Sequence, residues 1–264
     1  MKNILPYLLL ALFLIGCPSP KPIQKEELPP PPPATKELVR EITIRYASID
    51  VSKYAKKIEK SDIQKFAAQL KKDSIDLITI QGITRYPELK TRIDLVDELG
   101  TSAEMRKAFG ETINISGRQN GNGVFAVYPI RSSDNLQFEN LKSTGFEAAM
   151  QTIVDCGVRD IVVISTQISE KATQSDVKSI MTTLGQLIQT FPDHPIIISG
   201  NLATTESSRS MTAYDNVPAD QDSETPSVWF SKSELLKVLE EHTTSTVFGK
   251  MVVINFGIYR KPLP

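Results

Sequence analysis

Two apolar runs give the strongest indication of the fold of this chain: Asp76-Leu77-Ile78-Thr79-Ile80-Gln81-Gly82 and Pro195-Ile196-Ile197-Ile198-Ser199-Gly200-Asn201-Leu202-Ala203. Both are short and bounded by turn-forming residues, which predicts strands over 75–80 and 195–199. The three consecutive isoleucines of the second run indicate a strand that is buried on both faces. A strand of this kind needs helices to cover its sheet.

Amphipathic segments on either side of these runs supply such helices. Ser61 and Asp62 can cap a helix whose apolar residues, Ile63 to Leu70, recur at helical spacing. Residues 173–191 form a second helical pattern with an apolar stripe. Further strands are expected over 41–49 and over 149–155 with 160–168. The alternation of strands and helices predicts a layered α/β fold.

The remaining segments have weaker patterns. We expect two short helices within 88–109, the second opened by a Thr101–Glu104 capping box. Residues 120–123, Asn-Gly-Asn-Gly, predict a turn that leads into a strand over 124–130. Residues 200–231 are expected to form a long polar loop. A helix over 233–241 and strands within 246–259 complete the prediction.

The N-terminus has the pattern of a lipoprotein signal. Lys2 precedes an apolar run, Ile4 to Ile15, which is shorter than the roughly 20 residues needed to cross a bilayer. The run ends in Leu14-Ile15-Gly16-Cys17, which resembles the lipobox of bacterial lipoprotein precursors. The resemblance implies cleavage before Cys17 and a lipid on its thiol, which would hold the chain to a membrane. An ordinary signal with a chance cysteine, or an uncleaved anchor, is the alternative.

A proline-rich segment follows Cys17 and includes five consecutive prolines, residues 29–33. Such a stretch favours an extended polyproline helix and predicts a stalk, with a polyproline ligand for a partner as the alternative. The predicted organisation is a signal peptide over 1–16, lipidated Cys17 with a linker over 17–40, and one domain over 41–264.

Composition limits the classes of function. The 264 residues are 40% hydrophobic and 23% charged, with a formal net charge of −1, so nucleic acid is an unlikely partner. Loss of Lys2 with the signal would change the net charge to −2. If Cys17 carries lipid, Cys156 is the only free thiol, and we expect it to be buried and structural.

Five blocks in the globular part resemble the endonuclease/exonuclease/phosphatase family, which has a deoxyribonuclease-I-like fold. In chain order, the blocks are 44–49, 76–82, 123–130, 164–168 and 195–203. The resemblance covers roughly residues 41–260. It implies a four-layer α/β sandwich, with two facing mixed β-sheets flanked by helices, and Mg²⁺-dependent hydrolysis of phosphoester bonds.

The sequence departs from the family at each position that carries this chemistry. The family has an Asn at the end of the first strand, a Glu after Gln, a His after Thr, a Gly-Asp-x-Asn motif and an Asp before an aromatic residue. The residues in these places here are Ser48, Gly82 after Gln81, Gln167, Asn201 with Ala203, and Asn255. The family's C-terminal Asp-His pair is also not seen.

Other candidate groups do not replace what is missing. Glu147 is the one acid near a family-like block, and we expect it to be an exposed strand residue. His194 and His242 are expected to be surface or capping residues. If the blocks are misaligned, metal ligands could instead come from the polar loop, which contains Asp215, Asp220, Asp222 and Glu224.

The leading hypothesis is therefore a membrane-anchored, non-catalytic lipoprotein that binds or scaffolds an envelope protein, with no cofactor and no catalytic residue. The alternatives are an Mg²⁺-dependent phosphoesterase with relocated ligands and an unrelated α/β lipoprotein. Pro18, where an Asp would favour inner-membrane retention, favours the outer membrane in a diderm host. An uncovered sheet edge near the C-terminus would give a partner a place to bind.

Overall fold

The computed structural model describes residues 42–54, 58–87, 93–139, 141, 147–169, 171–202, 211–217, 225–232 and 235–259. The predicted signal peptide, Cys17 and the linker lie outside these residues. The elements in chain order are β1 (Ile42–Asp50), α1 (Lys60–Lys72), β2 (Leu77–Arg85), α2 (Leu95–Ala103), β3 (Arg106–Ile115), β4 (Arg118–Ala126), β5 (Ile130–Gln137), β6 (Ala148–Asp155), β7 (Asp160–Thr166), α3 (Gln174–Gln189), β8 (Ile196–Gly200), β9 (Tyr214–Val217), β10 (Ser227–Ser231), β11 (Leu236–Thr246) and β12 (Gly249–Ile258).

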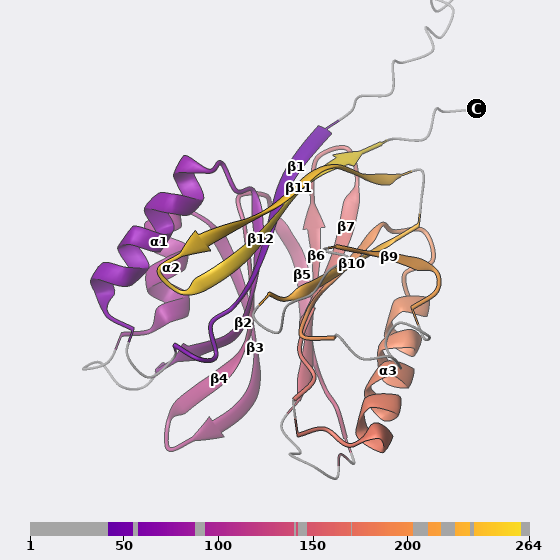
Figure 1. Ribbon diagram of the computed structural model, residues 1–264, viewed down its shortest axis with the longest axis horizontal. Helices are drawn as coiled ribbons and strands as arrows, with labels where there is room; N and C mark the ends of the chain where they lie inside the picture. Colours follow the sequence, from indigo (N-terminus) through magenta and orange to yellow (C-terminus); the bar gives the residue numbers. More distant parts are fainter. Residues whose placement is uncertain are drawn as a thin grey trace, which may run out of the picture. The chain divides into compact units, whose positions relative to one another are not determined.

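Two six-stranded sheets form the centre of the fold (Figure 1). The strand order is β11-β12-β1-β2-β4-β3 in the first sheet and β5-β6-β7-β8-β10-β9 in the second. Strands β1 and β2 are parallel, as are β7 and β8, and the other pairs are antiparallel. Both sheets are therefore mixed.

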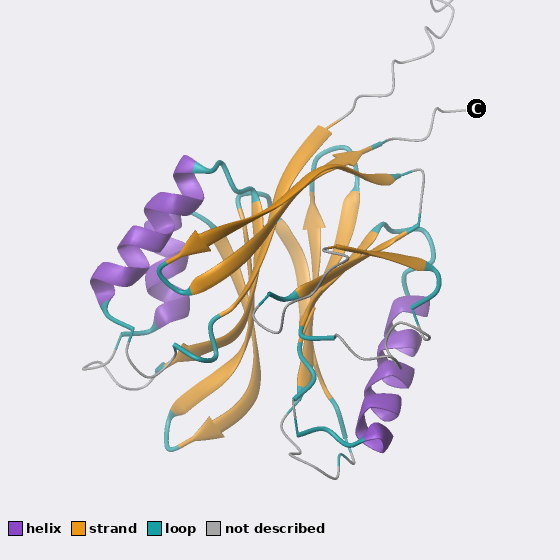
Figure 2. Cartoon of the chain, viewed as in Figure 1, coloured by secondary structure: helices purple, strands orange, loops and turns teal. Residues whose placement is uncertain are grey.

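Helices cover the outer face of each sheet (Figure 2). The apolar faces of α1 and α2 pack on the first sheet, around Phe66 and Leu99. The apolar face of α3 packs on the second sheet, around Ile180 and Leu184. A third cluster, which includes Tyr46 and Phe256, lies between the sheets. The predicted four-layer α/β sandwich is confirmed.

The two apolar runs that predict strands over 75–80 and 195–199 form central strands. All nine residues of β2 except Arg85 are buried, and β8 is buried throughout. Helices α1 and α3 also form where their periodicity predicts them, each with a capping box at its start. Residues 148–155 and 160–166 form the expected antiparallel pair.

The predicted pair of helices within 88–109 is wrong. A single helix, α2, begins after Asp94, whose side chain accepts hydrogen bonds from Val96 N and Asp97 N. Glu104 ends this helix in a left-handed conformation, φ 59°, instead of opening a second one. Strand β3 follows, because its residues pair with β4 along the whole of both strands.

The predicted turn at residues 120–123 is also wrong, since these residues lie inside β4. The chain turns instead at Ser116 and Gly117, which both have positive φ, as a two-residue hairpin turn requires. Gly121 is needed for close packing: a Cβ there would lie 2.0 Å from the carbonyl oxygen of Gly110 on β3.

The C-terminal part departs furthest from the prediction. Residues 236–241 of the segment expected to be a helix over 233–241 belong to β11, in which Leu236 and Val238 alternate toward the core between the sheets. Residues 214–217 and 227–231 of the predicted loop form β9 and β10. Strand β12 lies beside β1, so β11 forms the outer edge of the first sheet.

Candidate functional site

The expected site lies where β1 and β2 of the first sheet face β7 and β8 of the second. Ser48 on β1 and Gln81 on β2 are both fully buried, and Ser48 Oγ lies 3.4 Å from Gln81 Oε1. The Gln81 amide nitrogen donates to Ser165 Oγ on β7 at 3.0 Å and is 3.4 Å from Ser199 Oγ on β8. The Gln81 side chain thus joins the two sheets.

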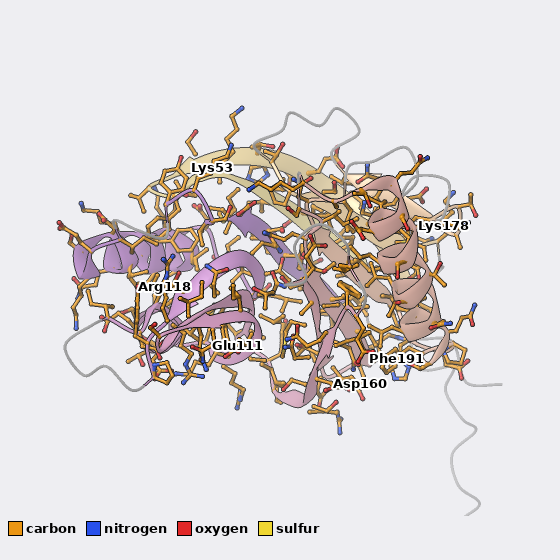
Figure 3. All side chains as sticks on the ribbon, turned by 90° about the horizontal axis from the view of Figure 1, so that it is seen from below. Lys53, Glu111, Arg118, Asp160, Lys178 and Phe191 are labelled. Atoms are coloured by element: carbon orange, nitrogen blue, oxygen red, sulfur yellow. The ribbon has the colours of Figure 1, made fainter. Side chains whose placement is uncertain are left out.

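Hydroxyl groups extend this connection. Thr79 Oγ1 lies 2.7 Å from the Tyr46 hydroxyl and 2.6 Å from Ser199 Oγ. Burial raises the pKa of Tyr46 to about 12, although hydrogen bonds with Ser199, Thr79 and Ser48 oppose that rise. We call Tyr46, Ser48, Thr79, Gln81, Ser165 and Ser199 the inter-sheet network; all six are neutral and fully buried. Figure 3 looks into the sandwich from below, with side chains of both sheets between them.

Gly82 is held in a conformation that leaves no room for a side chain. Its φ is +69°, and the pairing of β2 with β4 shifts register between Ile80 and Ile83. A Cβ on Gly82 would lie 2.5 Å from Ser52 Cβ and 2.7 Å from Ser52 Cα. The Asp50 carboxylate holds Ser52 there by accepting a hydrogen bond from Ser52 N at 2.8 Å. The glutamate that the resemblance expects therefore does not fit at this position.

The ends of β7 and β8 lie equally close together. Gly200 has φ +143°, and a Cβ there would overlap the carbonyl oxygen of Thr166. Ile168 N donates to Asn201 O at 2.9 Å, which ties the two strand ends to each other. Gln167 and Asn201 are half-buried at this margin of the network. Ala203 lies outside the described residues.

Glu147 is buried, so the expectation that it is an exposed strand residue is wrong. It is 5% exposed instead of lying on the surface, and its Oε1 accepts a hydrogen bond from Ser169 N at 3.0 Å. The next residue, Ala148, accepts at its carbonyl oxygen from Asn122 Nδ2 and Thr166 Oγ1. A buried acid therefore lies beside β6 and β7.

Asn255 is not part of this group. It lies on β12, where it accepts from Arg45 Nε at 2.9 Å and donates to Glu240 at 2.8 Å. Strand β12 lies in the first sheet, between β11 and β1. The structure thus brings Ser48 and Gln81 together, keeps Gln167 and Asn201 at their margin, and separates Asn255 from all four.

The other candidate groups are also apart from the network. Asp215 lies on edge strand β9 with Lys232 Nζ 3.4 Å away, and Asp220, Asp222 and Glu224 lie outside the described residues. His242 is exposed in the middle of β11, and the ring of His194 packs edge-on against Phe191. Within the described ranges, no group of three His, Cys, Asp or Glu residues could hold a metal ion.

Cys156 is buried, as expected. It is 1% exposed, and burial, with smaller effects from nearby aspartates, raises the pKa of its thiol to about 12. A thiol with so high a pKa is protonated at neutral pH and is a poor nucleophile. We therefore assign it a packing role.

A cavity of about 290 Å³ lies at the other end of β2. Leu70, Ile75 and Met105 form apolar parts of its lining, and Lys71 and Glu104 form an ion pair there. Asp76 accepts a hydrogen bond from Arg45 N at 2.8 Å; its pKa is raised by burial, partly offset by this bond and by the charge of Arg45. This end of β2 is charged, whereas the inter-sheet network is neutral.

Mg²⁺ does not fit the inter-sheet network. The ion needs hard oxygen ligands, usually including carboxylates, in octahedral geometry. The network offers only hydroxyl and amide groups that bond one another, and Gly82 leaves no space for a carboxylate. We derive no catalytic step through a metal at this place.

Solved structures show what the fold resembles. Similar chains include an endonuclease/exonuclease/phosphatase from Beutenbergia cavernae (13% identity, TM-score 0.62, 82% of this chain and 72% of that one). A second is an endonuclease/exonuclease/phosphatase from Bacteroides vulgatus (9% identity, TM-score 0.63, 82% of this chain and 99% of that one). A third is the human Nocturnin catalytic domain with bound sulfate (13% identity, TM-score 0.62, 83% of this chain and 97% of that one). The sequence matches no family model, and a search of the curated proteins finds no relative. At these identities the likeness shows the fold alone: it is that of the endonuclease/exonuclease/phosphatase proteins.

Proposed function

We propose that this chain is a lipid-anchored protein of the cell envelope whose phosphatase-like domain binds or scaffolds a partner without hydrolysing phosphoesters. One observation carries the proposal: neutral, mutually bonded side chains fill the place where the resemblance expects catalytic residues. The crowding of Gly82 by Ser52 supports it further.

Two properties of the inter-sheet network oppose catalysis: its side chains carry no formal charge, and they are not accessible. Phosphoester hydrolysis needs a group that activates water and groups that neutralise the charge developing on the phosphoryl oxygens. Hydroxyl and amide groups provide no formal charge for either task. The six network residues are also 0% exposed, so neither water nor a phosphate reaches them without a change of structure.

The proposed anchor is Cys17, with the proline-rich residues 18–36 as a stalk. No helix among the described residues is long and apolar enough to span a membrane. A lipid on Cys17 would attach the chain by burying its methylenes, at about 0.8 kcal/mol each, which makes several acyl chains a lasting anchor. Pro18 favours placement on the outer membrane if the host has two membranes.

Hydrolase assays test the catalytic half of the proposal. The full chain is assayed on a phosphodiester and a phosphomonoester, with Mg²⁺ and then Mn²⁺. We expect turnover equal to that of a metal-free control. Metal-dependent turnover lost in Asp215→Asn, but kept in the exposed control Asp134→Asn, would establish a phosphoesterase with relocated ligands and overturn the proposal.

Membrane fractionation tests the anchor. We expect Cys17→Ala to move from the membrane to the soluble fraction, because it has no thiol to carry lipid. Cys156→Ala is the matched control and should stay with the membrane, since Cys156 is buried in the domain. Retention of Cys17→Ala in membranes until detergent is added would refute lipid attachment at this residue.

A further inference from the structure

The four edges of the two sheets differ in how they are covered. Edges β3 and β5 lie together: the side-chain amides of Asn135 and Gln137 on β5 both donate to Glu111 O on β3. Edge β9 is only four residues long. Edge β11 is eleven residues long, and β12 is the only described element with which it makes more than isolated contacts. Strand β11 is therefore the one long, open edge in the described part of the chain.

The first part of β11 is protected against pairing with another chain. The register with β12 shifts between Val238 and Glu240, which is a β-bulge at Leu239. Lys237 precedes the bulge and lies over the ring of Tyr259. Lysines and bulges are the means by which edge strands avoid edge-to-edge association.

The second part of β11 has neither protection. From Glu240 to Thr246 the register with β12 is unbroken, and the segment contains no lysine and no proline. Three of its seven residues are threonines, which favour extended backbone, and Glu240 to Thr243 are exposed. This segment has the properties of an edge that can accept another strand.

The direction of the free backbone groups follows from one contact. Ser245 O accepts a hydrogen bond from Gln69 Nε2 of α1, so this carbonyl points away from β12. In an antiparallel ladder alternate residues face the same way, which places the backbone groups of Glu241 and Thr243 outward as well. Displacement of the Gln69 side chain would leave three residues able to pair.

We infer that residues 241–245 of β11 pair, antiparallel, with the same segment of a second copy of this chain, about a two-fold axis at Thr243. Such an axis places Thr243 opposite itself, Glu241 opposite Ser245, and His242 opposite Thr244, so no like charges meet. Threonine pairs across strands are favourable. An axis at Glu240 or Glu241 would instead place carboxylates opposite each other.

A second copy is the occupant that this segment fits because the pairing is self-complementary, as a two-fold interface requires. The inference draws on the proposed function in one respect: a lipid anchor confines copies to one surface and raises their local concentration. It does not depend on the absence of catalysis. The dimer would join two six-stranded sheets into one.

Thiol crosslinking in membranes tests the interface. In the full chain, Thr243→Cys should form a dimer with a short bis-maleimide, whereas Ser179→Cys, on the exposed face of α3, should not. The unsubstituted chain distinguishes a failure of the proposed lipid anchor from a failure of the inferred dimer. Because buried Cys156 is inaccessible to the reagent, crosslinking of this chain would show that Cys17 has a free thiol and carries no lipid. Equal crosslinking by the two variants, or crosslinking of Thr243→Cys only to a different protein, would overturn the inferred dimer.

A charge substitution provides the second test. In detergent, analytical ultracentrifugation of the full chain should show a concentration-dependent dimer. Thr243→Lys places two lysines opposite each other and should raise the dissociation constant at least about tenfold, whereas Ser179→Lys should leave it unchanged. Both sites are exposed, so both variants should keep the parent's far-ultraviolet circular dichroism. A parent that stays monomeric at every concentration, or a folded Thr243→Lys that dimerises as well as the parent, contradicts the inference.

Discussion

The two ends of β2 are built from opposite kinds of side chain. At its start, half-buried Asp76 lies beside Arg45, and the ion pair of Lys71 with Glu104 lies in the lining of the same cavity. Further along, Thr79 and Gln81 belong to a network without formal charge. One end has space and charge, whereas the other is filled and neutral.

The contrast between the two ends of β2 shows where charge is tolerated in the sandwich. A buried charge needs a partner or water, because its desolvation is costly. The start of β2 offers both, since it opens into a cavity and has Arg45 beside it. The inter-sheet network offers neither, so a carboxylate introduced there would be isolated. The comparison predicts unequal responses to charge substitutions at the two ends.

The largest effect on stability is expected for Gln81→Glu, which puts a carboxyl group into the neutral inter-sheet network at β2. We expect it to lower the free energy of unfolding by about 4 kcal/mol at pH 8, because full burial disfavours the ionised form. Burial raises the folded-state pKa above the unfolded value, so the loss should shrink as pH falls toward about 4. Urea denaturation at several pH values measures this.

The control for this variant is Gln64→Glu on the exposed face of α1, which should change stability by less than about 0.5 kcal/mol. If Gln81→Glu were as stable as the parent at pH 8, the neutral end would have to admit water or a counter-ion. The contrast between the two ends would then be lost.

Gly82→Ala should have the second largest effect. Its Cβ would meet Ser52 at 2.5 Å, and φ +69° is unfavourable for alanine, so we expect a loss of about 2 kcal/mol. Gly185→Ala is the matched control: no atom lies within 4 Å of its Cβ in α3, so the substitution should stabilise by up to about 1 kcal/mol. Thermal denaturation of both variants compares them, and equal midpoints would show that Ser52 moves aside freely.

Tyr46→Phe should cost about 1 kcal/mol at neutral pH, since Thr79 keeps its bond with Ser199 when the Tyr46 hydroxyl is removed. The alkaline response adds a sharper test. Tyr46 stays protonated in the folded state to about pH 12, whereas an unfolded tyrosine releases its proton near pH 10. The unfolded state then binds fewer protons, so stability falls as pH rises from 10 toward 12, by up to about 1.4 kcal/mol per pH unit.

Phenylalanine cannot ionise, so Tyr46→Phe should lose less stability than the parent over this pH interval. Parallel stability curves for the two proteins between pH 10 and 12 would mean that the Tyr46 hydroxyl is not desolvated. Guanidinium denaturation at fixed pH steps gives both curves.

The smallest effect is expected for Asp76→Asn, which removes a charge from the charged end. Asparagine keeps an acceptor for Arg45 N, and burial raises the pKa of Asp76, so the ionised form is slightly disfavoured. We therefore expect unchanged or slightly higher stability at pH 7, by less than about 1 kcal/mol after solvent screening. Urea denaturation measures it, and a loss of more than 2 kcal/mol would show that the negative charge itself is required.

Local patterns in the sequence predict much of the fold. The periodicity of α1 and α3 and the apolar runs of β2 and β8 are enough, because each element buries its own pattern on one neighbouring layer. The prediction fails for β3 and β11. Both segments have residues compatible with a helix, but pairing with β4 and β12 decides their conformation.

The candidate site, like the fold, can be predicted from the sequence only in part. The neutral character of Ser48, Gln81 and Gln167 can be read from the chain, and with it the departure from the expected catalytic chemistry. The burial of Glu147 and the pairing of Asn255 with Arg45 cannot, since both depend on strands far away in the sequence.

The layers of the sandwich and the chemical types at the expected site can be predicted from the chain alone, because hydrophobic periodicity and side-chain charge are local properties. The packing of distant segments is needed to show that Ser52 crowds Gly82, that β1, β7 and β8 converge on Gln81 of β2, and that β11 is left as an open edge among the described residues. Each of these depends on which distant segments meet when the two sheets pack face to face.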